Sequence, residues 1–184
     1  MKSYTRIASL VFGVTMLLLS FLVTAETLLR KLASFSIGGV DELAGYAIAI
    51  GAPLAFTVAL AERSHIRINL LYLQMGTRAK GLLDALSIIA LGTLALFLAY
   101  FTVKTVVDTQ TYQSIAQTPW ATPLIYPQAL WALAMLVFTL PAIWMTARAI
   151  GMLGGGQWQA LTRCFGPESV EDELKAELDD LQRR

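Results

Sequence analysis

Four long stretches of the chain carry no charged residue, and each is about as long as a lipid bilayer is thick. Residues 7–25, 43–61 and 85–103 contain no Asp, Glu, Lys or Arg, and residues 109–147 contain a fourth such stretch. A helix of this length covers about 28 Å, close to the hydrocarbon core of about 30 Å. None shows the period-two alternation of membrane barrel strands. The pattern therefore predicts an all-α integral membrane protein with four transmembrane helices, at about residues 7–25, 43–61, 83–103 and 125–147.

The composition leaves little of the chain for anything outside the membrane. Of 184 residues, 56% are hydrophobic and 15% are charged, whereas about 25% are charged in an average soluble domain. The spans and their connections account for residues 1–150, which we take as one membrane domain, and residues 151–184 form a tail. No nucleic-acid partner is expected.

The basic residues gather on one side of the predicted spans. If the spans alternate in direction, eleven of the 14 Lys and Arg fall on the side of both termini and three fall on the other. The eleven are Lys2, Arg6, Arg63, Arg67, Arg78, Lys80, Arg148, Arg163, Lys175, Arg183 and Arg184; the three are Arg30, Lys31 and Lys104. By the positive-inside rule, we expect both termini in the cytoplasm.

The first stretch has a second interpretation, as a cleaved signal peptide. Lys2 and Arg6 precede it, and Val23-Thr24-Ala25 resembles a small-residue cleavage site. Its apolar length of 17 to 19 residues exceeds the roughly 7 to 15 of a signal peptide. The length therefore favours a retained transmembrane helix.

A polar segment separates the first two predicted spans. Glu26 and Arg30 stand four residues apart, which on a helix would place them as an ion pair. Apolar residues between and after them would form a stripe on the same segment: Leu28, Leu29, Leu32 and Phe35. This pattern predicts a helix that lies in the membrane interface.

Polar side chains also mark both ends of the second span. Asp41 and Glu42 open it, where negative charge complements the helix dipole, and the second acid also suits a contact with a partner. Residues 62–71, Glu-Arg-Ser-His-Ile-Arg-Ile-Asn-Leu-Leu, close it. This cluster can be a basic loop that fixes the topology and touches anionic lipid. A lone His65 beside two Arg is more often a structural group than a proton carrier.

Inside the spans, the informative residues are prolines and glycines. Pro53 and Pro141 lie within the second and fourth spans and predict helix kinks. Gly45, Gly51 and Gly92 are small enough to let neighbouring helices approach closely.

The uncharged stretches hold no ionisable side chain, and the chain lacks the motifs of common catalytic sites. Transport sites and proton relays need ionisable residues or broken helices at membrane depth. The sequence has no Gly-rich phosphate loop, no His/Cys cluster with metal-ligand spacing and only one His. We therefore expect no enzyme, no cofactor, and no catalytic or metal-binding residue.

The order of these features resembles a known family. A first span, Arg30, the pair Asp41-Glu42, a second span and then residues 62–71 with His65-Ile66-Arg67 are similar to the small permease subunit of tripartite ATP-independent periplasmic (TRAP) transporters, the DctQ-like family. The family pattern after its second span is roughly R-x-x-H-I-R-V-D-L-L. This chain departs from the family at residues 36–40, where a Trp is usual, and at Asn69, where Asp is commoner.

The resemblance implies a bacterial inner-membrane importer of three parts. A periplasmic binding protein would deliver a solute, often an organic acid, to two membrane subunits driven by an ion gradient, commonly sodium. The large permease would carry the substrate and ion sites, and this chain would support it as a symport component. The residues it would use for contacts with the permease or with membrane lipids are Arg30, Asp41, Glu42, Glu62, Arg63, His65, Arg67 and Asn69. Two alternatives stay open: an autonomous oligomeric transporter or channel, and a membrane anchor for another complex.

The tail predicts one more helix. Residues 154–156 are three glycines that would form a flexible joint, and Ser169 can cap a helix that follows. Val170, Leu174, Leu178 and Leu181 recur with helical spacing among acids. We expect a short amphipathic cytoplasmic helix there.

Overall fold

The computed structural model of the chain describes residues 2–62, 72, 74–167 and 178. Within these residues the chain forms helices and no strand, apart from an isolated bridge between Ile115 and Pro123. The helices are α1 (Lys2–Leu32), α2 (Val40–Glu62), α4 (Thr77–Tyr112), α5 (Ile125–Gly154) and α6 (Trp158–Phe165). Four of them, α1, α2, α4 and α5, are long and apolar enough to cross a membrane. The all-α fold with four candidate spans is therefore confirmed.

The long helices extend beyond the predicted spans. The 36 residues of α4 correspond to about 54 Å, much more than a hydrocarbon core of about 30 Å. The charged residues of α4 lie toward its two ends, outside the uncharged stretch of residues 85–103. Helix hydrogen bonding therefore continues into the polar layers on both sides of the predicted span.

The first helix includes the segment that we expected to be a separate interfacial helix. α1 runs unbroken through Glu26 and Arg30 to Leu32. Residues 26–32 contain no Gly or Pro, so nothing in the local sequence interrupts the helix. The chain turns only afterwards, where Ser34, Gly38 and Gly39 have φ of 52°, 69° and 74°. The prediction of a separate helix is therefore wrong, because residues 26–32 are the last turns of α1. The tail helix predicted from Ser169 lies outside the described residues.

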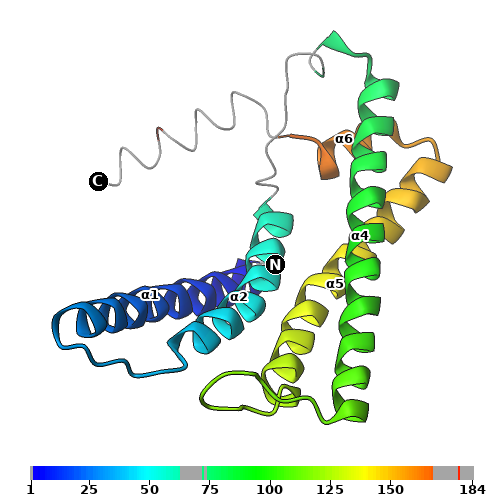
Figure 1. Cartoon of the computed structure of the whole chain (residues 1–184). Coiled ribbons are helices and arrows are strands. Elements are labelled where there is room, and N and C mark those ends of the chain that lie inside the picture. Colours follow the sequence, from blue (N-terminus) through cyan, green and yellow to red (C-terminus); the bar gives the residue numbers. More distant parts are fainter. Residues whose placement is uncertain (1, 63–71, 73, 168–177, 179–184) are drawn as a thin grey trace. The chain divides into compact units, whose positions relative to one another are not determined.

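The described chain divides into two compact units, Met1–Ser64 with Leu91–Met145 and His65–Ala90 with Thr146–Arg184. In the first unit, α1 and α2 lie side by side and are joined by residues 33–39 (Figure 1). Gly51 of α2 lies against α1, since a Cβ on it would be 2.6 Å from Met16 Cε and 3.2 Å from the Phe12 ring. Gly45 has no neighbour within 4 Å of such a Cβ. Of these two glycines, only Gly51 lets the helices approach.

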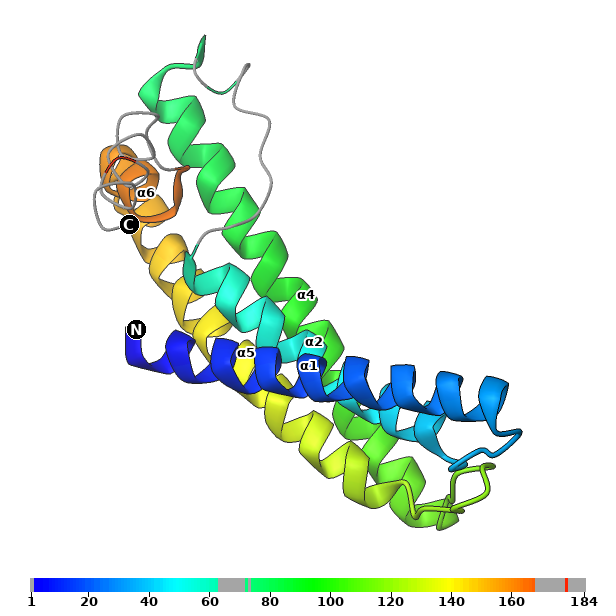
Figure 2. The ribbon, with the colours of Figure 1, turned by 90° about the vertical axis from the view of Figure 1, so that its left-hand side faces the viewer.

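Helix α2 also contacts α5 in this unit. The rings of Phe56 and Phe138 lie 5.7 Å apart at a tilted angle, and Phe138 is buried. Figure 2 shows the path of α2 and α5 from a second direction. Small and flexible side chains fill the rest of the buried interior of this unit: Ala8, Val40, Leu60, Ala95, Ala134, Met135, Ala142 and Met145.

Hydroxyl side chains inside the long helices bond to their own backbone. Thr57 donates to the Pro53 carbonyl at 2.9 Å, Thr102 to the Leu98 carbonyl at 2.8 Å, and Ser20 to the Met16 carbonyl at 2.9 Å. Such bonds satisfy a polar group where no water is present. Both Pro53 and Pro141 lie within helices that continue past them.

In the second unit, α6 packs against the first turns of α4. A Cβ on Gly81 would lie 3.0 Å from the Trp158 carbonyl oxygen and 3.2 Å from its Cα, so only glycine allows this approach without a shift. Leu161 is fully buried and Phe165 is 3% exposed. The Thr146 hydroxyl of α5 donates to the Ile88 carbonyl of α4 at 3.1 Å. These contacts define a small core made by the ends of three helices.

The three glycines after α5 form a helix cap. Gly156 has φ of 63°, its N–H donates to the Leu153 carbonyl, and the Gln157 N–H donates to the Met152 carbonyl. This is the Schellman arrangement, in which a residue with positive φ satisfies the last carbonyls of a helix. The segment that we predicted to be a flexible joint is thus a defined turn that leads directly into α6.

The contrast between Gly51 and Gly45 gives a prediction for stability. Alanine in place of glycine inside a helix normally stabilises by about 0.5–1 kcal/mol. We expect this gain for Gly45→Ala and its loss or reversal for Gly51→Ala, because the new methyl group meets Met16 and Phe12. Unfolding of the two variants in the same detergent measures the difference. Equal gains would contradict the α1–α2 packing described above.

Candidate functional site

A cluster of hydrogen bonds surrounds Glu42 at the start of α2. The Glu42 side chain is 7% exposed, and its Oε1 accepts a hydrogen bond from the Tyr46 hydroxyl at 2.6 Å. Its Oε2 accepts one from the Thr118 hydroxyl, and Thr122 adds another. A buried carboxylate is tolerated where donors surround it in this way.

The loop between α4 and α5 supplies the two threonines. α4 ends at a Schellman-type turn, in which Gln113 has φ of 49° and the Ser114 N–H donates to the Thr109 carbonyl. The loop then folds back on itself through the bonds from Ala116 N to Thr122 O and from Leu124 N to Ser114 O. This turn brings residues 118 and 122 to Glu42, which precedes Thr118 by 76 positions.

Trp120 covers the same end of α2. A Cβ on Gly39 would lie 2.5 Å from the Trp120 ring, and Gly39 has φ of 74°. Both observations require glycine at this position. The loop therefore contacts α2 through an apolar ring as well as through the two threonines.

A second buried carboxylate ties α1 to the turn that follows it. Glu26 is 7% exposed and accepts hydrogen bonds from the Ser36 hydroxyl at 2.5 Å and from the Ile37 N–H at 2.9 Å. Arg30 contributes to the electrostatic surroundings of Glu26, but less than these two donors. The sequence predicted an ion pair between Glu26 and Arg30; in the structure the principal partners of Glu26 are Ser36 and Ile37 in the turn.

These two carboxylates hold separate segments of the described chain together. Glu26 fixes the end of α1 to residues 36–37, and Glu42 fixes the start of α2 to the α4–α5 loop. Among the described residues, no group of His, Cys, Asp and Glu could hold a metal ion. The arrangement is suited to positioning a rigid surface at this end of the first unit.

The second unit contains a buried acid that the sequence analysis missed. Asp84 of α4 is 1% exposed and accepts a hydrogen bond from the Tyr72 hydroxyl at 2.7 Å. The Lys80 ammonium lies 5.4 Å from the centre of the Tyr72 ring. Asp84 directly precedes the uncharged stretch that begins at residue 85, so the pattern of uncharged residues gives no signal for it.

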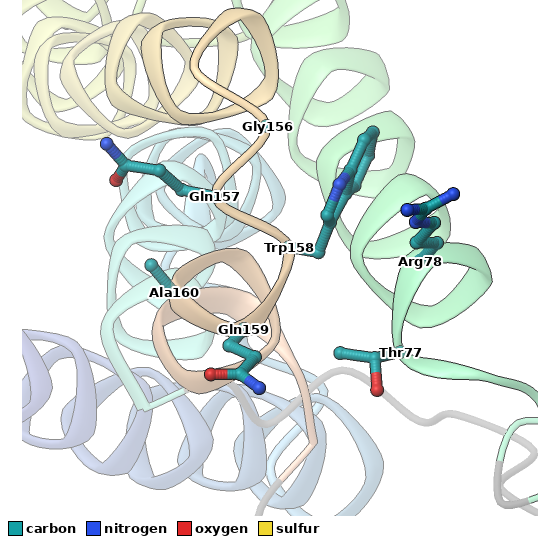
Figure 3. A pocket seen from close by; sticks show the side chains of 7 residues that line it. All are labelled: Thr77, Arg78, Gly156, Gln157, Trp158, Gln159 and Ala160. Atoms are coloured by element: carbon teal, nitrogen blue, oxygen red, sulfur yellow. The ribbon is translucent and has the colours of Figure 1, made fainter.

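A pocket of about 500 Å³ lies between the start of α4 and the start of α6 in the same unit. Figure 3 shows Thr77 and Arg78 of α4 on one side and Trp158 on the other. Gly156, Gln157, Gln159 and Ala160 complete the lining. The sequence analysis did not identify α6, although Trp158, Leu161 and Phe165 recur at spacings of three and four residues, a helical signal.

The structure separates the predicted contact residues into different settings. Arg30, Asp41 and Glu62 are exposed, whereas Glu42 is buried in its hydrogen-bond cluster. The other predicted residues lie outside the described part of the chain: Arg63, His65, Arg67 and Asn69. Tyr46, Thr118 and Thr122, which form the cluster with Glu42, were not identified from the sequence.

Comparison with known families identifies the membrane domain. The family model for the DctQ component of tripartite ATP-independent periplasmic transporters matches residues 19–151, which is more than half of the chain. The chain belongs to this family. No curated protein matches the chain.

Membership assigns the general role of this DctQ component. Members are the small membrane component of TRAP transporters, which also contain a large permease and a periplasmic binding protein, and they are not enzymes. The family and the four apolar helices together indicate a multi-pass protein of the inner membrane. The resemblance seen in the sequence is confirmed. The match includes Glu42 and its cluster, whereas α6 lies beyond its end.

The adjacent acids of this DctQ component provide a matched test of the Glu42 cluster. We expect Glu42→Ala to lower the melting temperature in detergent by about 5 °C, because buried hydroxyl donors lose their acceptor. Asp41→Ala removes an exposed carboxylate from the same helix end and should change it by less than about 2 °C. Equal shifts would show that charge at the helix start, rather than the cluster, is what stabilises this end.

Proposed function

We propose that this DctQ component supports the large permease of a TRAP transporter during uptake of an organic acid. In this proposal a periplasmic binding protein delivers the organic acid, and a sodium gradient drives its transport through the large permease. The family match over residues 19–151 is the observation that carries the proposal. The distribution of polar and apolar side chains supports it.

The buried ionisable groups favour a supporting role over a transport site. In the described residues the buried acids are Glu26, Glu42 and Asp84. Each accepts a hydrogen bond from a neighbouring side chain: Ser36, Thr118 and Tyr72, respectively. A carboxylate that couples an ion to transport must exchange its partners during each cycle. Carboxylates held this way suit a fixed structure better.

The apolar surface of α1 fits a subunit that is covered by something else. Leu17 is 69% exposed and Phe21 is 75% exposed in the isolated chain. Of the most apolar part of α1, only 6% is buried inside the structure. In the membrane this surface faces lipid tails or helices of the large permease. A large uncovered apolar face is expected of one component of a larger membrane assembly.

The polar residues at the end of α1 and at the two ends of α2 would set the position of this subunit. Arg30, Asp41 and Glu62 are exposed at helix ends, where they can contact the permease or lipid headgroups. We propose the same role for Arg63, His65, Arg67 and Asn69, on the basis of the sequence alone. In this proposal none of these residues performs chemistry.

The excess of basic residues on one side leads us to propose that both termini face the cytoplasm. Alkaline phosphatase, which is active only outside the cytoplasm, should be active when fused after Lys104 and inactive when fused after Arg78. Fusions of a fluorescent protein that matures only in the cytoplasm serve as the control and should give the opposite pattern. Active phosphatase after Arg78 would reverse the topology.

Reconstitution tests the proposed division of labour. In vesicles with an inward sodium gradient, we expect uptake of an organic acid only when this chain, the large permease and the binding protein are all present. The physical reason is that the uncharged stretches at residues 7–25, 43–61, 85–103 and 109–147 hold no acidic or basic side chain that could couple an ion to transport. Gradient-driven uptake by this chain alone would refute the proposal and favour an autonomous oligomeric transporter.

A further inference from the structure

The pocket between α4 and α6 is a feature that the family assignment does not cover. Its wall on one side is Thr77 and Arg78, which lie within the matched residues, and its other wall is residues 156–160, which lie beyond them. The volume of about 500 Å³ is large enough for a small polar ligand or a lipid headgroup. Two fixed elements define it, because Gly81 allows the Trp158 backbone to approach α4 closely.

The lining offers donors for an anion. The Arg78 guanidinium carries five N–H donors in a fork that matches phosphate oxygens, and the neighbouring Thr77 hydroxyl is a further donor. Arg78 is exposed, and Figure 3 shows it on the same side of the pocket as Thr77, opposite the start of α6. Among the residues that the structure describes, no carboxylate lines the pocket. The chemistry of this lining therefore suits a ligand with negative charge.

Most of the charged side chains described in this unit are positive, like Arg78. Within residues 72–90 and 146–167, as far as the structure describes them, the cationic side chains are Arg78, Lys80, Arg148 and Arg163, and the acid is Asp84. Asp84 is 1% exposed and is bonded to Tyr72, so it presents little negative charge to the surface. Apart from the buried Asp84, the described charged side chains of this unit are therefore basic.

The position of Arg78 along α4 also predicts that the pocket lies at the depth of lipid headgroups. Arg78 precedes the uncharged stretch of α4 by seven residues, which is about 10 Å along a helix axis. Headgroups occupy the polar layer next to a hydrocarbon core of about 30 Å. Trp158, which faces Arg78, is of the residue type that accumulates at this boundary between apolar and polar layers. A phosphate group of the membrane would thus lie at the level of the guanidinium.

We propose that this pocket binds the phosphate group of an anionic membrane lipid, with Arg78 as the main ligand and Thr77 as a second donor. The acyl chains of the lipid would continue along the apolar surface of α4, toward Leu82 and Leu86, which are 53% and 60% exposed. The bound lipid would fill the space between α4 and α6 and fix α6 at the membrane surface. The inference does not depend on which solute is transported or on the large permease.

Native mass spectrometry of the full chain in detergent tests the proposal. Phosphatidylglycerol is titrated in, with phosphatidylcholine as the zwitterionic comparison and inorganic phosphate as a competitor. Arg78→Gln removes the proposed ligand, and Arg6→Gln is the matched control, because it removes an exposed Arg of α1 from outside the pocket. Melting temperatures without lipid verify that both variants are folded.

We expect the wild type and Arg6→Gln to bind phosphatidylglycerol equally and in preference to phosphatidylcholine. Arg78→Gln should bind it about fivefold more weakly, and Arg78→Lys should fall between them because it keeps the charge but loses the fork. Displacement of phosphatidylglycerol by inorganic phosphate would show that the phosphate group is what the pocket recognises.

Two results would overturn the proposal. If Arg78→Gln and Arg6→Gln bind phosphatidylglycerol equally well, the contact is not made in this pocket. If inorganic phosphate binds in an Arg78-dependent way but phosphatidylglycerol does not, the pocket takes free phosphate and the lipid is excluded as its ligand. The Thr77→Ala variant gives a second measurement, and an affinity identical to the wild type would remove Thr77 from the site.

Discussion

A bilayer offers no hydrogen-bonding partner to a polar group, and this constraint shapes each part of the structure. The backbone meets it by forming helices that continue beyond the uncharged stretches, as α4 does over 36 residues. Hydroxyl side chains meet it by bonding to carbonyls of the preceding turn, as Thr57 does beside Pro53. Charged side chains meet it by lying toward the helix ends, where either water or fixed donors are available.

Buried acids in this chain join separate segments of the backbone. Glu42 brings the start of α2 to the α4–α5 loop through Thr118 and Thr122, and Glu26 brings the end of α1 to the turn at Ser36. A carboxylate has four acceptor positions, so one side chain can hold several donors at once. Such a cluster gives a short loop a defined position without a large core, which matches the supporting role proposed for the subunit.

Close approach of segments at glycines is the second way in which this small protein holds its segments together. Gly51 admits the side chains of α1, Gly39 lies under the Trp120 ring, and Gly81 lets the start of α6 reach α4. Each glycine lies at a contact between two segments rather than in a flexible joint. In the second unit this approach produces both the small core around Leu161 and the pocket beside Arg78.

The sequence by itself determined the number and approximate position of the membrane helices and the family. Length and lack of charge are local properties, and a helix that satisfies its own backbone needs no distant partner to cross a bilayer. Residues 26–32 were correctly predicted to be helical, because helix formation is also a local property. What the sequence did not show is that these residues continue α1 instead of forming a helix of their own.

The tertiary structure decided which polar residues are partners. Asp41 and Glu42 are adjacent acids in the sequence, yet only Glu42 turns toward Thr118, which lies 76 positions away. Nothing local distinguishes the two acids, because the difference comes from the fold of a distant loop. The same holds for Asp84, whose partner Tyr72 precedes α4, and for α6, whose eight residues are held by packing against Gly81. A helix that short is not stable alone, so its existence depends on tertiary contacts that a sequence pattern does not contain.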